Sequence, residues 1–247
     1  MRSCATACSR APRCWPVYAL DSSGLAKRSR RSKSQAQPHR GLEPADFLRA
    51  RRALMRQDRV LAPVIRKHRA RSLLDAPALE PFPALVRTIT SQQISTRAAA
   101  TIHGRLVASM PEGVTPEALL ALGETQFREA GLSRQKVVYL RDLATKVQTG
   151  ELPVASLHEL DDEAVIDAIV TVKGLGRWSA EMFLMFRLRR PDVLPVGDLG
   201  IVTAIQRLYG LRKKPTPARM IKIGEAWRPY RTVACWYLWR SLENDGD

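Results

Sequence analysis

The apolar residues of this chain recur at intervals of three and four from Pro44 onward, and Gly and Pro interrupt the pattern repeatedly. That interval is the period of a helix that buries one face, and no stretch alternates apolar and polar residues as a half-buried strand does. The pattern therefore predicts an all-α fold. The predicted helices cover residues 45–57, 58–69, 83–90, 95–109, 116–130, 134–148, 162–171, 177–188, 199–209, 217–226 and 230–242.

The first 45 residues follow a different pattern. They are rich in Ser, Arg, Ala and Pro, include the basic run 27–33, and show no hydrophobic periodicity. A segment of this composition cannot bury enough apolar surface to offset the entropy lost on ordering. We therefore predict a disordered basic tail over residues 1–45 and one folded domain over residues 46–247. An Arg- and Ser-rich, acid-poor start also fits an organellar transit peptide or a misassigned start codon.

The chain is strongly basic, with 40 Lys and Arg against 24 Asp and Glu and a net charge of +16. Residues 1–76 hold 18 of these basic residues and five of the acidic ones, so residues 77–247 carry only +3. Basic charge attracts polyanions, but a charge run is often just a solvated surface. Charge by itself therefore leaves the partner open. No apolar run approaches the roughly 18 residues of a membrane helix, so we expect no membrane contact.

The cysteines predict neither a metal site nor a redox site. Cys4, Cys8 and Cys14 lie in the predicted tail, where their spacing matches neither a zinc site nor a CxxC pair. Cys235 stands alone in an apolar helix, which is typical of a buried thiol.

A glycine-rich turn, residues 172–177, separates two predicted helices. In it, Gly174 and Gly176 flank Leu175. Glycine lets the backbone approach a phosphate closely, and the second helix begins at the turn, so its unpaired N–H groups face the same anion. The turn is therefore predicted to bind a DNA phosphate without reading the bases. A tight corner between two helices, with no ligand, is the alternative.

Asp198 ends a segment that Pro191 and Pro195 hold extended, because proline disfavours the α region in the residue before it. It also precedes the helix predicted at 199–209. Asp198 is therefore either an N-cap or a carboxylate presented for chemistry, and the two roles are compatible. A carboxylate at a helix N-terminus is well suited to stabilise a positive charge nearby.

The segment after the turn carries Trp178, Met182 and Met185 at helical spacing. Such a stripe is more typical of core packing than of a binding pocket.

Together these segments resemble the helix-hairpin-helix DNA glycosylase superfamily, most closely its 3-methyladenine DNA glycosylase II branch. The resemblance rests on VKGLGRWSAEMF…DVLPVGDLGI, in which Asp198 lies 22 residues after Gly176. Three further segments support it: TSQQIS at 90–95, GLSRQK at 131–136 and WRPYR at 227–231. The resemblance covers residues 46–243. It implies a two-lobed helical fold with the active site in a cleft between the lobes.

The resemblance implies an enzyme that flips a damaged base out of duplex DNA and hydrolyses its N-glycosidic bond in base excision repair. Asp198 takes the position of the catalytic aspartate, where it would stabilise an oxocarbenium-like transition state and activate water. The sequence offers no obvious second carboxyl on the matching motif. However, 3-methyladenine and 7-methylguanine are already cationic in DNA and leave as neutral bases. Alkylated purines are therefore the predicted substrates.

By the same resemblance, Trp178, Met182 and Trp239 line the substrate pocket, although isolated tryptophans are more typical of a core. Met182 replaces an aromatic residue found in some relatives, which affects the breadth of accepted bases. Trp178 also stands where the glycosylase-lyases carry a Schiff-base lysine, so we expect no strand nicking. The four-cysteine iron–sulfur motif of other branches is missing, and we expect no cofactor.

The resemblance also implies a set of DNA contacts. The DNA-binding residues are Gln93, Lys173, Gly174, Leu175 and Gly176. Gln93 stands where the family inserts a side chain into the gap left by the flipped base, and a solvated loop residue is the alternative. A monovalent cation that aids phosphate binding would take the backbone carbonyls of Val170, Val172 and Leu175.

The implied partner is double-stranded DNA that contains alkylated bases, and we expect a monomer. The protein would lie in the cytoplasm with the nucleoid in a bacterium, or in the nucleus in a eukaryote. Two other functions fit the residues. One is a glycosylase for mispaired or oxidised bases, and the other is a non-catalytic helix-hairpin-helix module in which Asp198 only caps its helix.

Overall fold

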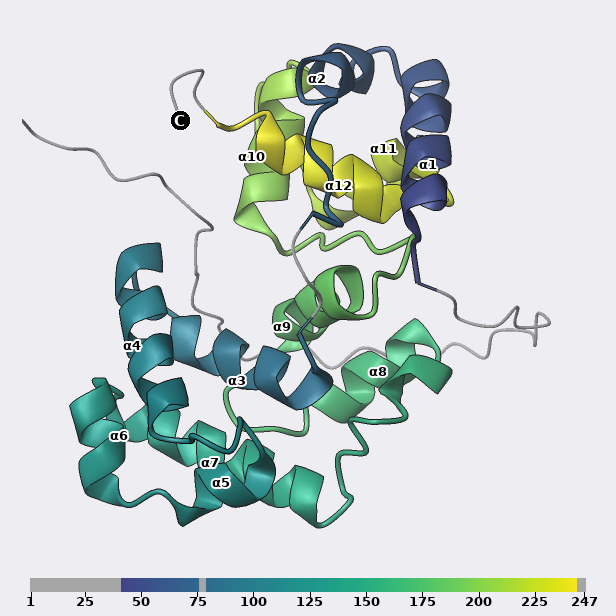
Figure 1. Ribbon diagram of the computed structural model, residues 1–247. Coiled ribbons are helices and arrows are strands. Elements are labelled where there is room, and N and C mark those ends of the chain that lie inside the picture. Colours follow the sequence, from purple (N-terminus) through teal and green to yellow (C-terminus); the bar gives the residue numbers. More distant parts are fainter. Residues whose placement is uncertain (1–40, 76–78, 244–247) are drawn as a thin grey trace, which may run out of the picture.

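The computed structural model describes residues 41–75 and 79–243, and the regular elements in these two ranges are all helices (Figure 1). The all-α prediction is therefore confirmed. Most of the predicted tail lies outside the described residues, and α1 begins at Pro44. In the same two ranges, no helix has both the length and the apolar character needed to span a membrane.

The described ranges contain twelve α-helices and three short helices of other types. The α-helices are α1 (Pro44–Gln57), α2 (Leu61–Lys67), α3 (Pro81–Ser91), α4 (Thr96–Ala108), α5 (Pro116–Ala121), α6 (Glu124–Ala130), α7 (Arg134–Gln148), α8 (Asp162–Ile169), α9 (Arg177–Met182), α10 (Leu199–Leu208), α11 (Pro217–Gly224) and α12 (Arg231–Arg240). The others are the 3₁₀ helices η1 (Leu157–Glu159) and η3 (Glu225–Trp227), and the π-helix η2 (Phe183–Arg187).

Two lobes are visible in Figure 1, as predicted. One lobe holds α3–α8, in which α7 packs against α3 and α5, and α3 packs against α4. The other holds α1, α2 and α10–α12, in which α12 packs against α1, α2 and α10. Helix α9 lies between the lobes and packs against α8. The lobe with α12 is therefore built from both ends of the described chain.

Helix α12 is the centre of its lobe. Every residue from Thr232 to Trp239 is buried. A helix that is apolar on all sides must be surrounded by other elements, and α1, α2 and α10 surround this one. Phe47 of α1 packs against Trp236 and Tyr237 with ring centroids 6.0 and 6.2 Å apart. This packing holds the C-terminal end of α12, including Trp239, in a defined place.

Three predicted helix ends are confirmed by their caps. Gly150 and Gly210 follow α7 and α10 with φ of +78° and +61°, a backbone region that suits glycine at a helix end. Asp161 caps α8, and its Oδ1 accepts the N–H of Ala164 at 2.8 Å.

The single helix predicted over residues 116–130 is wrong. Helix α5 ends at Ala121 and α6 begins at Glu124, with Leu122 and Gly123 extended between them. Glycine loses the most backbone entropy inside a helix, so a break at Gly123 costs little. The side chain of Gln126 accepts the N–H of Gly123 at 2.7 Å, which stabilises the new helix start.

Candidate active site

Asp198 receives N–H donors from three elements. It is the N-cap of α10, and its Oδ1 accepts the N–H of Ile201 at 2.8 Å. The indole N–H of Trp239, on α12, donates to the same oxygen at 2.9 Å. The indole N–H of Trp178, on α9, donates to Oδ2 at 2.8 Å. The predicted cap is confirmed, and the structure adds two indoles that hold the carboxylate in one orientation.

The backbone around Asp198 permits this close assembly. The residue is 3% exposed, and it ends a loop that is tied to α12. In that tie, the hydroxyl of Thr232 donates to the Arg190 carbonyl at 2.6 Å and accepts the N–H of Val193 at 3.0 Å. A Cβ on Gly200 would lie 3.0 Å from both Asp198 Oδ1 and Trp239 Cδ1. Glycine at that position therefore leaves room for the indole beside the helix N-terminus.

Two of the three predicted pocket residues, Trp178 and Trp239, bind the carboxylate directly. Trp178 is half-buried, Trp239 is 6% exposed, and Met182 follows one turn after Trp178 on α9. Met185, of the same predicted stripe, is instead fully buried in the core. Trp178 is therefore the tryptophan with the more accessible ring.

A change of helix type explains the place of Met185 and reveals a residue that the sequence analysis missed. The chain is π-helical from Phe183 to Arg187, and the wider turns rotate the later side chains. Phe186 is half-buried, with its ring centroid 5.8 Å from that of Trp239. Phe186 lies four residues after Met182, and this spacing was the signal that could have placed it beside the pocket. The sequence analysis missed it because hydrophobic periodicity does not reveal a π-helix. Phe186 extends the aromatic surface beside Asp198.

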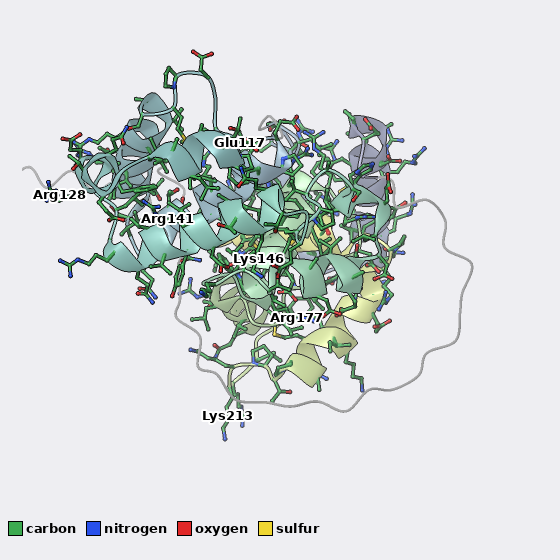
Figure 2. All side chains as sticks on the ribbon, turned by 90° about the horizontal axis from the view of Figure 1, so that it is seen from below. Glu117, Arg128, Arg141, Lys146, Arg177 and Lys213 are labelled. Carbon is green, nitrogen blue, oxygen red and sulfur yellow. The ribbon has the colours of Figure 1, made fainter. Side chains whose placement is uncertain are left out.

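Glu181 is a second carboxyl that the sequence analysis missed. Its side chain is 7% exposed, and its Oε1 lies 3.3 Å from Nε of Arg177. Arg177 also donates to both oxygens of Glu163, at 3.0 and 2.6 Å. The pKa of Glu181 is raised to about 7: burial is the largest cause, the charge and hydrogen bond of Arg177 oppose it, and the charges of Glu163 and Asp198 add to it. In the view of Figure 2, Arg177 lies near the centre of the picture, and Arg128 and Lys213 project from its edges.

The glycine turn between α8 and α9 is a tight hairpin. Gly174 has φ of +80°, and Gly176 is the N-cap of α9 with no side chain bound to the helix end. Leu175 is 4% exposed, and its backbone N–H donates to the carbonyl of Val172 at 3.1 Å. Lys173 donates its backbone N–H to Asp142 at 2.9 Å. The Lys173 N–H is therefore already bound within the protein.

The carbonyls of Val170, Val172 and Leu175, named for a monovalent cation, lie in this hairpin. The Val172 carbonyl already accepts one N–H, and a carbonyl oxygen has a second lone pair. In the described ranges, no cluster of three or more His, Cys, Asp and Glu side chains could hold a metal ion.

Gln93 lies in the loop between α3 and α4 and is exposed. Its φ is +56°, a left-handed conformation that is uncommon for a residue with a side chain. Such a conformation persists only where the surroundings impose it.

A cavity of about 510 Å³ lies elsewhere, between the start of α3 and η1. Its lining includes Phe82, His158 and Arg187, and neither Asp198 nor the residues predicted for the pocket line it. The convergence of indole donors on a carboxylate therefore defines the candidate site better than this cavity does.

Comparison with known proteins agrees with this geometry. Residues 86–229 match the family model of the HhH-GPD superfamily base excision DNA repair proteins. The chain is 36% identical to DNA-3-methyladenine glycosylase 1 of Schizosaccharomyces pombe over 165 residues, which are 66% of this chain and 72% of that protein.

Two solved structures share the fold. The 3-methyladenine DNA glycosylase (Mag1) of S. pombe, in complex with abasic DNA, is 30% identical with a TM-score of 0.69, over 78% of this chain and 96% of that one. The DNA-3-methyladenine glycosidase of Bacillus halodurans is 36% identical with a TM-score of 0.68, over 78% and 88%. This chain therefore belongs to the HhH-GPD superfamily of base excision DNA repair proteins.

Proposed function

We propose that this protein is a monofunctional DNA glycosylase that flips alkylated purines out of double-stranded DNA and hydrolyses their N-glycosidic bond. The observation that supports this most is the Asp198 carboxylate, which lies between the indoles of Trp178 and Trp239. The 36% identity to a protein named DNA-3-methyladenine glycosylase 1 supports the substrate class, with 3-methyladenine and 7-methylguanine as the bases to test.

The proposed chemistry uses one carboxylate. As the glycosidic bond breaks, positive charge develops on the deoxyribose, and Asp198 stabilises that charge. The two indole N–H groups and the helix N-terminus keep the carboxylate in place, so little reorganisation is needed during the reaction. The base is already cationic and leaves neutral, so its departure requires no general acid. Water then forms the new C–O bond at the sugar carbon and loses its proton to Asp198 or to solvent.

The aromatic side chains favour a cationic base. Trp178 donates through the N–H edge of its ring to Asp198, and the ring is only half-buried. An electron-rich ring face attracts a cation, by about 0.5 to 2 kcal/mol. Phe186 and Met182 complete the proposed pocket.

Two observations support a hydrolase without lyase activity. Trp178 stands where the lyases of the superfamily carry their nucleophilic lysine. The donors to Asp198 in the described part of the chain are two indoles and a backbone amide, and two lysines near the hairpin are bound elsewhere: Lys173 to Asp142 and Lys136 to the Thr90 carbonyl. We expect no strand cleavage without added base.

The proposed DNA contacts follow from the two loops. The N–H groups at Gly174, Gly176 and the start of α9 would bind a phosphate, since no side chain caps that helix. Gln93, exposed in the other loop, would fill the gap left by the flipped base. A monovalent cation on the hairpin carbonyls would add positive charge beside the phosphate.

The test is release of free base from defined DNA. We expect the protein to release 3-methyladenine and 7-methylguanine from methylated duplex, identified by mass spectrometry. Asp198→Asn should lower the single-turnover rate by about 10²- to 10³-fold and leave affinity for undamaged duplex nearly unchanged. Full turnover by Asp198→Asn would refute the mechanism.

The two rival functions predict different results in the same assay. Release of a mispaired or oxidised base, without methylated purines, would assign the other glycosylase class. Tight binding with no base released from any of these duplexes would assign a non-catalytic DNA-binding module.

A further inference from the structure

The two loops of the proposed DNA contacts are far apart in sequence but joined in space. The amide nitrogen of Gln92, in the loop between α3 and α4, donates to the carbonyl of Gly174 at 2.8 Å, across 82 residues. Gln92 immediately precedes Gln93, and Gly174 is the left-handed glycine of the hairpin. One side chain therefore links the gap-filling loop to the phosphate-binding loop.

Helix α7 supports both loops from one side. The amine of Lys136 donates to the carbonyl of Thr90, in the last turn of α3, at 2.8 Å. One turn further, the ring of Tyr139 lies so close to Gly174 that a Cβ there would come within 2.1 Å of it. The carboxylate of Asp142 accepts the N–H of Lys173 at 2.9 Å. These α7 residues are three positions apart, so they share one side of the helix.

The conformation of Gln93 shows why such support is needed. A left-handed backbone costs a residue with a side chain about 1 kcal/mol or more, and neighbouring contacts must hold it. Gln92 and the end of α3 are those neighbours, and both are anchored outside the loop. Burial also lowers the pKa of Lys136, which reflects the enclosed position of this anchor.

We propose that Gln92 is a positioning residue for base flipping, whose amide sets the distance between the Gln93 side chain and the hairpin. The inference rests on the proposed function, in which the hairpin holds a phosphate and Gln93 enters the duplex. Along one DNA strand, a gripped phosphate and an emptied base position are separated by a set distance. If the distance between the two loops changed, the protein would still bind DNA, but Gln93 would fill the gap poorly.

The experiment compares Gln92→Met with the wild-type protein. Methionine has a similar length and no charge but cannot donate to Gly174. We expect the single-turnover rate on methylated duplex to fall by about ten- to a hundredfold, since small displacements of positioning groups have effects of this size. The fluorescence of 2-aminopurine opposite a stable lesion analogue, which reports flipping, should fall in parallel. Affinity for undamaged duplex should change less than about twofold, because the phosphate contacts remain.

Two further variants make the result specific. Gln92→Glu replaces the donor by an oxygen that repels the Gly174 carbonyl, and it should be at least as impaired as Gln92→Met. Gln148→Glu, at the exposed end of α7, adds the same charge away from both loops and should behave as wild type. Should Gln92→Met not fold, Gln92→Asn keeps the amide on a shorter arm and provides the same comparison.

Each outcome decides the proposal. An unchanged flipping signal in folded Gln92→Met would overturn it. So would a loss of affinity for undamaged duplex as large as the loss of rate, because Gln92 would then only shape the hairpin. If the wild-type protein releases no base at all, the proposed function fails instead, and that result is separate from any effect of Gln92.

Discussion

Asp58 and Asp198 are two buried carboxylates with nearly the same local chemistry. Each lies before a helix and accepts backbone N–H groups from the start of that helix: Val60 and Leu61 donate to Asp58, and Ile201 donates to Asp198. Each also accepts an indole N–H, since Trp227 donates to Asp58 at 2.7 Å. Their exposed fractions are 8% and 3%.

The difference lies in where their partners come from. The side-chain donors to Asp58 are Trp227, which is fully buried, and the hydroxyl of Tyr209, and both belong to the lobe of α12. Burial and the bond to Asp58 raise the pKa of Tyr209, so this hydroxyl stays a donor. The donors to Asp198 come from α12 and from α9, which lies between the lobes. Asp58, whose donors all come from one lobe, is thus a structural group. Asp198, whose indole donors come from α12 and from α9, is the candidate catalytic group.

Exchange of each aspartate for asparagine should give the largest contrast. Asp198→Asn is expected to lose about 10²- to 10³-fold in base release. Asp58→Asn should lower the free energy of unfolding by about 3 kcal/mol, because one of its buried donors then faces an amide nitrogen. Urea denaturation and single-turnover assays on both variants measure the two effects. A rate loss in folded Asp58→Asn as large as that in Asp198→Asn would contradict the assignment of Asp58 as structural and of Asp198 as catalytic.

Glu181 adds a third buried carboxyl to the comparison of Asp58 with Asp198, and its pKa is raised. Its pKa rises from 4.5 to about 7, so between these values the folded protein binds more protons than the unfolded chain. The contribution of Glu181 to the free energy of unfolding is therefore fully present below pH 4.5 and is lost as the pH rises toward 7. Arg177, Glu163 and Asp198 are the charged groups that act on it.

We expect Glu181→Gln to gain stability relative to wild type as the pH rises, by about 3 kcal/mol between pH 4.5 and 7.5. Urea denaturation at several pH values within this range measures the difference. Parallel stability curves for the two proteins would show that Glu181 titrates normally.

Removal of a single indole donor should give the smallest effects. Trp239→Phe keeps an aromatic ring but removes the N–H from Asp198, and we expect about a tenfold loss in rate, as for one bond to a charged group. Trp227→Phe removes the N–H from Asp58 and should cost about 2 kcal/mol in stability, with the rate of the folded protein unchanged. Equal effects of both variants on rate would contradict the assignment of Asp58 as structural.

Local features of this protein were predictable from the sequence. The helix caps at Gly150, Asp161 and Gly210 lie where their residue types indicate. The hairpin turn and the capping role of Asp198 were also predicted, because a cap or a turn depends on residues within about four positions. The break at Gly123 was missed, since helical periodicity continues through it.

The sequence by itself determined most of the helices, several of their ends and the segment that delivers Asp198, and its motifs indicated the family. The resemblance already assigned Trp178 and Trp239 to the pocket, but only the tertiary structure decided that both indoles bind Asp198 directly and that Gln92 binds Gly174. Trp178 and Trp239 lie 20 and 41 residues from Asp198, and Gln92 lies 82 residues from Gly174. Such pairs depend on how whole helices pack, and a π-helical turn rotates Phe186 into place. The burial of Glu181, which raises its pKa, is likewise a property of packing and not of its neighbours in sequence.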